Sequence, residues 1–155
     1  MINKTIVLKI LDQKKVKYQY FEYDSNVTEG VAVAEKVGKN VDMVFKTLVT
    51  VDNSNSYHVF CIPVAKTLDL KKAAKMINKK SLDMIKQKEL EPLTGYVHGG
   101  CSPIGMKKKL PTYFDKSIDD NEEICVSGGR VGLQIQIKSQ DLIKLVQGRI
   151  LDLTL

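Results

Sequence analysis

The chain has 155 residues, of which 43% are hydrophobic and 27% are charged. This length and balance are typical of one folded unit, so residues 1–155 are expected to form a single domain around one core. No apolar stretch is long enough for a membrane span or a signal peptide, which predicts a cytoplasmic protein without a membrane partner. The three cysteines are odd in number and widely spaced, which argues against a disulfide framework and against a zinc site.

Positive charge is in excess, with a formal net charge of +6. A basic surface permits binding to nucleic acid, because lysine and arginine contacts to phosphates release counterions. A soluble, lysine-rich surface without such a partner explains the same excess. Many lysines are grouped, however, and this grouping favours a polyanionic partner. The groups are Lys14, Lys15 and Lys17; Lys71, Lys72 and Lys75; Lys79 and Lys80; and Lys107, Lys108 and Lys109.

The N-terminal part of the chain predicts a helix, a strand and a second helix. Residues 3–14 carry apolar side chains at helical spacing, and residues 18–23 are typical of a strand rich in aromatic residues. Thr28 is expected to cap the second helix, and Gly38 is expected to end it.

The middle of the chain predicts a hairpin followed by helices. Residues 43–51 and 57–64 are expected to be its strands, because the turn-forming segment 52–56 separates them. A helix over residues 69–77 is indicated by apolar residues at i, i+3, i+4 and i+7. A less regular helix is expected over residues 86–91.

The last third predicts short strands, glycine-containing loops and a final helix that begins after Ser139. The strands are expected over residues 95–97, 112–114, 123–126 and 132–137. Since strands and helices mix without a regular βαβ repeat, the pattern favours an α+β fold with a mixed or antiparallel sheet over a doubly wound fold.

Lys46 is the first residue that could carry chemistry. It lies in a predicted strand that is apolar on both faces, where an ammonium group is costly unless it reaches water or an anion. Two interpretations stay open: a lysine that binds an anionic substrate, and a lysine that extends its charged end into solvent from a half-exposed strand.

Two glycine-rich loops follow, at residues 95–105 and 126–132. Such loops let backbone N–H groups approach a ligand and stabilise a phosphate or an oxyanion, although they also occur as plain turns. In the first loop Cys101 and His98 suggest a cysteine hydrolase, but free cysteine is more often a small buried apolar residue. In the second loop Arg130 either binds a phosphate or carboxylate through two hydrogen bonds or belongs to an ordinary strand connection.

Five segments resemble the YbaK/EbsC family, in order and spacing, across nearly the whole chain. They are Val44-Phe45-Lys46-Thr47-Leu48; LDLKKAAK at residues 68–75; Thr94-Gly95-Tyr96; GGCSPIGMKK at residues 99–108; and Val126-Ser127-Gly128-Gly129-Arg130. The resemblance implies an α+β domain built around a strongly curved mixed β-sheet flanked by helices. This is the fold of the editing domain inserted in many bacterial prolyl-tRNA synthetases.

The resemblance also implies an activity, the trans hydrolysis of mischarged aminoacyl-tRNA, with Cys-tRNA(Pro) the usual substrate. It implies no organic cofactor and no metal, and it implies mischarged tRNA(Pro) and prolyl-tRNA synthetase as partners. In the mechanism it implies, the thiol of the substrate attacks its own ester, which agrees with a sequence that shows no catalytic-triad or metal motif. Two alternatives stay open: an Ala- or Ser-tRNA deacylase of the same fold that uses water, and a tRNA- or synthetase-binding module without activity.

Residue by residue, the resemblance places Lys46 at the family's functional lysine and the backbone of Gly99, Gly100 and Cys101 at the reacting ester. Further substrate-binding positions that it implies are Tyr23, Tyr96, Ser102, Pro103, Gly105, Ser127, Gly128, Gly129, Arg130 and Gln134. Some relatives carry an acidic residue where this chain has Gln134, which leaves open how the substrate's α-amino group is held. Relatives vary at Cys101, which argues against a nucleophilic thiol there.

Overall fold

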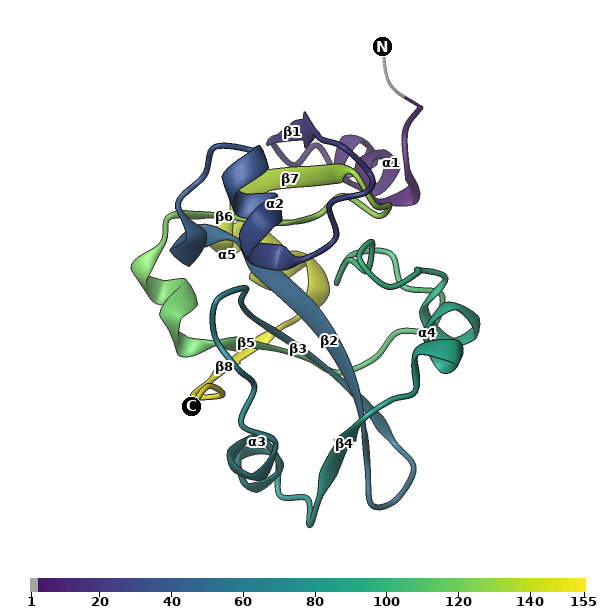
Figure 1. Ribbon diagram of the computed structural model, residues 1–155. Helices are drawn as coiled ribbons and strands as arrows, with labels where there is room; N and C mark the ends of the chain where they lie inside the picture. The colour runs from purple at the N-terminus through teal and green to yellow at the C-terminus, as the bar shows by residue number, and fades with distance from the viewer. Residues whose placement is uncertain (1–2) are drawn as a thin grey trace.

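The centre of the fold is a β-hairpin formed by β2 (Phe45–Asp52) and β3 (Tyr57–Pro63). In the computed structural model, which describes residues 3–155, the two strands pair antiparallel along their length (Figure 1). The turn predicted over residues 52–56 is confirmed, and so are the two predicted strands around it. Lys46 therefore sits near the start of a strand that a rigid hairpin holds in place.

A five-stranded mixed sheet grows outward from this hairpin, in the order β4-β2-β3-β5-β8. The added strands are β4 (Leu82–Met84), β5 (Thr112–Asp115) and β8 (Arg149–Leu151). β4 pairs antiparallel with β2, whereas β5 pairs parallel with β3 and β8 pairs parallel with β5. Both β4 and β8 are three residues long and were not predicted from the sequence.

A second, three-stranded sheet is antiparallel and has the order β1-β7-β6. Its strands are β1 (Tyr18–Glu22), β6 (Glu123–Ser127) and β7 (Leu133–Lys138). A single parallel bridge between Val44 and Cys125 joins this sheet to the start of β2. The predicted α+β class with a mixed sheet is confirmed, while the strong curvature stays a prediction.

The helices cover the faces of the two sheets (Figure 1). None of the helices within residues 3–155 is both long and apolar enough to cross a bilayer. The α-helices are α1 (Ile6–Gln13), α2 (Gly30–Lys36), α3 (Leu70–Met76), α4 (Gln87–Thr94) and α5 (Ser139–Val146), and the 3₁₀ helices are η1 (Val41–Met43) and η2 (Lys116–Asp120).

The core explains why β3 is buried along almost its whole length. One face of the larger sheet packs with the smaller sheet, α1 and α5, in a cluster that includes Val59, Phe114 and Leu142. The opposite face, with Phe60 and Ile62, packs against α3 and the end of the chain. A strand covered on both sides needs an apolar run rather than an alternating pattern.

Three local predictions were wrong, and each error has a local cause. The second helix is capped by Glu29 rather than Thr28, since the Glu29 carboxylate accepts hydrogen bonds from two N–H groups of the first turn. No strand forms at residues 95–97, because Gly95 ends α4 in the left-handed conformation, at φ 83°. Ser139 is the first residue of α5 rather than its cap, and its hydroxyl donates to the carbonyl of Asn121.

The hairpin turn is organised by the buried carboxylate of Asp52. It accepts hydrogen bonds from the backbone N–H groups of Ser54 (2.7 Å) and Ser56 (3.0 Å), and it lies 2.8 Å from Nε2 of His58. The Lys79 ammonium lies 3.5 Å away. These partners, His58 foremost, hold the pKa of Asp52 well below its usual range, although burial acts in the opposite direction.

The lowered pKa predicts how stability depends on acid. A carboxyl group with a depressed folded-state pKa stabilises the protein above its unfolded pKa, about 3.9, and loses this effect as the pH falls through the folded value. We expect Asp52→Asn to lower the thermal midpoint at pH 7 and the deficit to shrink as the pH falls below about 4. Melting curves from pH 7 to pH 2.5 test this, with Asp83→Asn at an exposed residue of β4 as the control. A deficit that stays constant down to pH 2.5 would contradict it.

Candidate functional site

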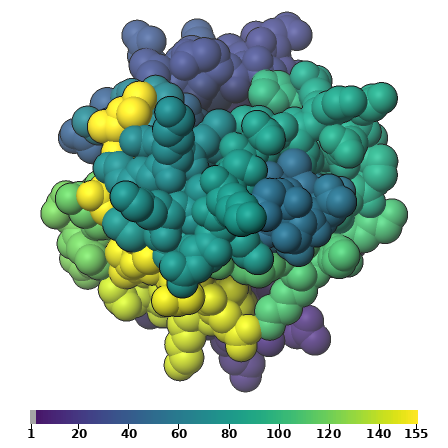
Figure 2. All heavy atoms as spheres, turned by 90° about the horizontal axis from the view of Figure 1, so that it is seen from below, coloured from purple at the N-terminus to yellow at the C-terminus, as the bar shows by residue number. Residues whose placement is uncertain are grey.

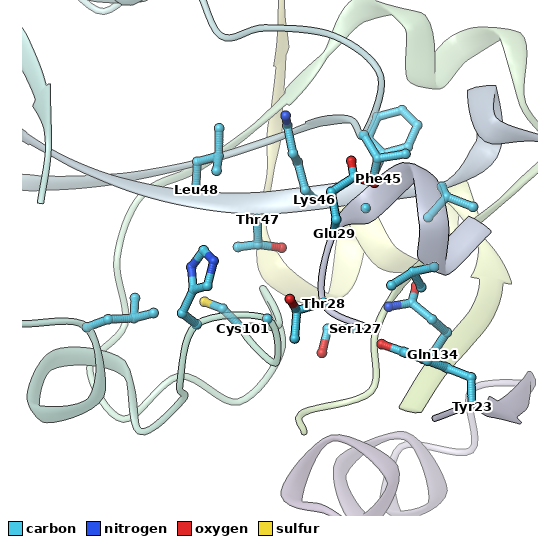
Figure 3. Close-up of a pocket in the computed structure, with 17 residues that line it drawn as sticks. Tyr23, Thr28, Glu29, Phe45, Lys46, Thr47, Leu48, Cys101, Ser127 and Gln134 are labelled. Atoms are coloured by element: carbon cyan, nitrogen blue, oxygen red, sulfur yellow. The ribbon is translucent and has the colours of Figure 1, made fainter. Parts of the chain in front are cut away.

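A cavity of about 350 Å³ lies between the first half of β2, the start of α2 and the two glycine loops (Figure 3). A volume of this size is typical of pockets that bind small organic groups. The residues that line it are Tyr23, Thr28, Glu29, Gly30, Val33, Val44, Phe45, Lys46, Thr47, Leu48, Val64, Leu90, His98, Gly99, Cys101, Ser127 and Gln134.

The cavity exists because one edge of β2 is unpaired along part of its length. Val44 is bridged to Cys125, and the carbonyl of Val49 accepts a hydrogen bond from the N–H of Ile85 at 3.2 Å. Between these two points, no strand within residues 3–155 pairs with this edge. Backbone polar groups of successive residues point to opposite edges of a strand, so the N–H and C=O of Thr47, two residues before Val49, point to the same edge as those of Val49. A ligand in the cavity therefore meets a free donor and a free acceptor of the main chain.

Lys46 and Thr47 flank this edge from opposite faces of β2. Figure 3 shows the Lys46 side chain extending to the same side as Leu48, while Thr47 points towards Cys101. The Lys46 ammonium has no hydrogen bond or ion pair with any of residues 3–155. Burial lowers the pKa of Lys46, and the nearby Glu29 carboxylate opposes this shift. The group is thus a partly desolvated cation available to an anionic ligand.

The first glycine loop contributes Gly99 and Cys101 to the wall of the cavity. Gly100 is buried and lies behind the wall, where its N–H donates to the Val97 carbonyl at 3.0 Å. The Gly100 amide is therefore already used, whereas the amides of Gly99 and Cys101 form no hydrogen bond with any of residues 3–155.

The thiol of Cys101 is a poor nucleophile in this setting. Burial raises the pKa of Cys101 to about 12, so that the thiolate is scarce at neutral pH. His98 also lines the cavity, but no hydrogen bond joins it to Cys101. The arrangement favours the reading of Cys101 as a wall residue over that of a cysteine hydrolase.

The second glycine loop contributes Ser127 to the wall of the cavity, whereas Gly128, Gly129 and Arg130 lie outside the lining. The Ser127 hydroxyl accepts a hydrogen bond from the N–H of Gly129 at 3.2 Å. Gly128 packs against Leu133, and its N–H donates to the Leu133 carbonyl at 2.8 Å. Arg130 forms an ion pair with Glu22 at 3.2 Å on the surface, outside the cavity lining.

Gln134 presents a buried acceptor without a partner. It lies on β7, lines the cavity with Tyr23, and has only 6% of its surface exposed. No group within residues 3–155 donates a hydrogen bond to its Oε1. A buried carbonyl without a donor costs about 1–3 kcal/mol, so this oxygen favours a ligand that brings an N–H or O–H group.

Besides Gly100, Gly128, Gly129 and Arg130, four more predicted site residues lie outside the lining of this cavity. Tyr96 and Ser102 are buried residues of the first loop itself, where the Tyr96 hydroxyl donates to the Ile104 carbonyl and Ser102 Oγ accepts from the Ile104 N–H at 3.2 Å. Pro103 and Gly105 line a separate hollow of about 260 Å³ beside α1 and α5. The structure therefore gives these residues a supporting position, and their contact with substrate stays a prediction.

Several lining residues were missed by the sequence interpretation. Thr47 and Leu48 adjoin Lys46, but only the pairing of β2 shows that they border an open edge. Glu29 has only a weak sequence signal, since a negative charge near the start of a helix is favoured by the helix dipole. Thr28, which precedes it, belongs to the residue types preferred as caps and is therefore the cap that the sequence predicts.

Comparison with known proteins places this chain in one family. The aminoacyl-tRNA editing domain family matches residues 24–145. The chain therefore belongs to the aminoacyl-tRNA editing domain family, which confirms the resemblance predicted from its motifs.

Particular relatives agree with this assignment. The chain is 39% identical over 153 residues to a protein of Enterococcus faecalis named as a candidate Cys-tRNA(Pro)/Cys-tRNA(Cys) deacylase, EbsC, with 97% of this chain and 93% of that protein covered. A crystal structure described as a candidate trans-editing enzyme for prolyl-tRNA synthetase is similar at a TM-score of 0.85 and 25% identity, covering 96% of this chain and 94% of the other. A hypothetical protein with a TM-score of 0.88 and 18% identity, covering 96% and 99%, shares the fold.

Contact between the two glycine loops predicts that Gly100 tolerates no side chain. A Cβ atom there would lie 2.8 Å from the Val131 nitrogen and 2.9 Å from the Arg130 carbonyl carbon, and neither backbone atom can move freely. We expect Gly100→Ala to lower the free energy of unfolding by about 1–3 kcal/mol, the usual cost of overpacking.

Chemical denaturation measures this change. Gly38→Ala is the control, since a Cβ at Gly38 meets no atom within 4 Å and adds only the strain of a left-handed residue. A stability for Gly100→Ala equal to that of the wild type would show that the loops do not depend on this contact.

Proposed function

We propose that this protein hydrolyses Cys-tRNA(Pro) in trans, and that the thiol of the bound cysteine is the nucleophile. The observation that carries the proposal is a cavity of an aminoacyl-tRNA editing domain in which the one cysteine of the wall, Cys101, has a raised pKa of about 12. The name of the Enterococcus faecalis relative supports the same substrate.

The reaction proceeds in two steps. The sulfur of the cysteinyl group attacks the carbonyl carbon of its own ester, and the C–O bond to the terminal ribose breaks as the C–S bond of a thiolactone forms. The thiol gives up its proton, and the ribose oxygen takes one. Water then opens the thiolactone to free cysteine. Intramolecular attack corresponds to effective molarities on the order of 10⁵–10⁸ M, so the protein has mainly to bind and orient the substrate.

The residues of the cavity receive the following roles. The amides of Gly99 and Cys101 stabilise the oxyanion that develops on the ester carbonyl. The Oε1 of Gln134 accepts a hydrogen bond from the α-amino group of the substrate. Gln134 thereby takes the place of the acidic residue of some relatives. Lys46 could contact either the ester or the terminal phosphate of the substrate. We assign it to the phosphate, because its ammonium extends to the side of β2 opposite Thr47 and Cys101 (Figure 3).

A tRNA partner is supported by the basic surface at the far end of the larger sheet. Figure 2 shows the face formed by α3, the segment after it and the hairpin turn. A shallow hollow on α3 and the segment after it is lined by Lys71, Lys72, Lys75, Lys79, Lys80 and Asp69. Such a surface attracts a phosphate backbone in a salt-dependent way. Association with prolyl-tRNA synthetase is proposed from the description of the 25% identical structure.

Lys46 provides the first test of this function. We expect Lys46→Ala to reduce the deacylation of Cys-tRNA(Pro) by at least about 100-fold, because a desolvated cation that contacts a charged group of the substrate contributes several kcal/mol to its stabilisation. Single-turnover assays with purified protein measure this. Lys66→Ala, an exposed lysine of the connection between β3 and α3, is the control. Turnover near the wild-type rate in a folded Lys46→Ala protein would exclude the assignment.

The choice of substrate tests the nucleophile. Serine and cysteine are close in size, so pocket shape alone should separate them by only about 10- to 200-fold. A hydroxyl is far less acidic than a thiol, so we expect Ser-tRNA(Pro) to bind but to be deacylated at least about 1000-fold more slowly, and Ala-tRNA(Pro) and Pro-tRNA(Pro) to be inert. Equal rates for Cys- and Ser-tRNA(Pro) would point to an activated water, and tight tRNA binding with no turnover would point to a binding module.

A further inference from the structure

His98 stands at the cavity without a role in the proposed function. Its side chain is exposed, it lines the cavity that Thr47, Leu90 and Cys101 also line, and neither ring nitrogen bonds to any of residues 3–155. The second histidine of the chain, His58, is buried and bonded to Asp52. His98 is therefore the single imidazole that faces the cavity.

A tight turn holds His98 at this place. The N–H of Gly100 donates to the Val97 carbonyl at 3.0 Å, which makes His98 and Gly99 the two central residues of the turn. Gly99 has φ 87°, the left-handed conformation that turns with glycine at the third position require. The base of the turn is fixed because Gly100 packs against the backbone of Val131. The imidazole is thus projected from a rigid support.

The proposed reaction needs a group that moves a proton, and the other titratable groups of the cavity are badly suited. Burial holds the Cys101 thiol protonated. Lys46, on β2, is a cation and has no lone pair to accept a proton while it remains charged. The Glu29 carboxylate, at the start of α2, is engaged by the N–H groups of Val31 (3.1 Å) and Ala32 (3.0 Å).

One more titratable residue and one apolar residue of α4 also line the cavity. Tyr23, which directly follows β1, carries a phenol, a group suited to hydrogen bonding. α4 contributes only the apolar Leu90. Imidazole is the side chain whose unperturbed titration falls between pH 5 and 8, which suits both acceptance and return of a proton.

We infer that His98 is the general base that removes the thiol proton of the bound cysteinyl ester and the general acid that returns it to the leaving ribose oxygen. A ring nitrogen accepts the proton as the sulfur attacks the carbonyl carbon, and the imidazolium donates it as the C–O bond breaks. Protons and electrons balance within the substrate and His98, and no co-reactant is needed. This inference rests on the proposed function.

The test is the pH dependence of single-turnover deacylation of Cys-tRNA(Pro) by His98→Gln, corrected for uncatalysed ester hydrolysis. At pH 6.5–7 we expect the variant to be about 100-fold slower than the wild type, the lower range of general acid–base contributions. Towards pH 9 the substrate thiol, with a pKa of about 8.5, ionises without help. The deficit should therefore shrink at least about 10-fold between pH 7 and pH 9.

Val97→Ala, an exposed position of the same turn, is the control, and thermal melts establish that each variant is folded. A full rate for His98→Gln at pH 7 overturns the inference. A deficit that stays constant from pH 6.5 to 9 also overturns it, because it shows a merely structural role for the side chain. Absence of Cys-tRNA(Pro) turnover by the wild type at every pH overturns the proposed function, and the inference falls with it.

Discussion

The structure depends on an interruption in the pairing of β2. A central strand normally satisfies its backbone groups on both edges, since an unpaired N–H or C=O away from water is costly. Here β6 borders the start of β2 and β4 borders its end, and the stretch around Thr47 is left open. This opening is part of the fold, because β6 and β4 belong to different sheets and lie at different ends of β2 (Figure 1). The cavity occupies the gap between them.

Both glycine loops are held against this opening by their contact with each other. Gly100 lies directly on the backbone of Arg130 and Val131, so the loop after α4 and the loop between β6 and β7 form one wall. The side chain of Gln134 continues the wall from β7, and Glu29 extends it from the start of α2. Segments from four parts of the chain thus meet at one strand edge.

Features fixed by neighbouring residues could be predicted from the sequence. The β2–β3 turn was predicted because Asp52 organises it within a few residues, and Lys46 was conspicuous because it interrupts an apolar run. The two glycine loops could be predicted because their glycines are visible in the sequence itself. Strands β4 and β8 were missed because three residues carry too little pattern, and they pair with residues distant in the chain.

The site could be predicted only where its residues interact with residues close to them in the chain. The sequence predicts an anionic ligand for Arg130, yet its partner is a carboxylate of the protein, that of Glu22, more than one hundred residues earlier in the chain. The open edge of Thr47 follows from which strands neighbour β2, and no residue type signals it. The role of Gly100 as a contact between loops, rather than as a donor to a ligand, likewise depends on residues of another segment.

The protonated thiols of the chain have a consequence for its chemistry under oxidative conditions. Burial raises the pKa of Cys61 and of Cys101 to about 12 and that of Cys125 to about 11. Peroxides and alkylating reagents attack thiolates, so these three sulfurs offer little for them to react with. If the reactive sulfur arrives with each substrate and leaves with each product, damage to it is carried away as well. The reaction of such an enzyme then depends on no thiolate of the protein itself.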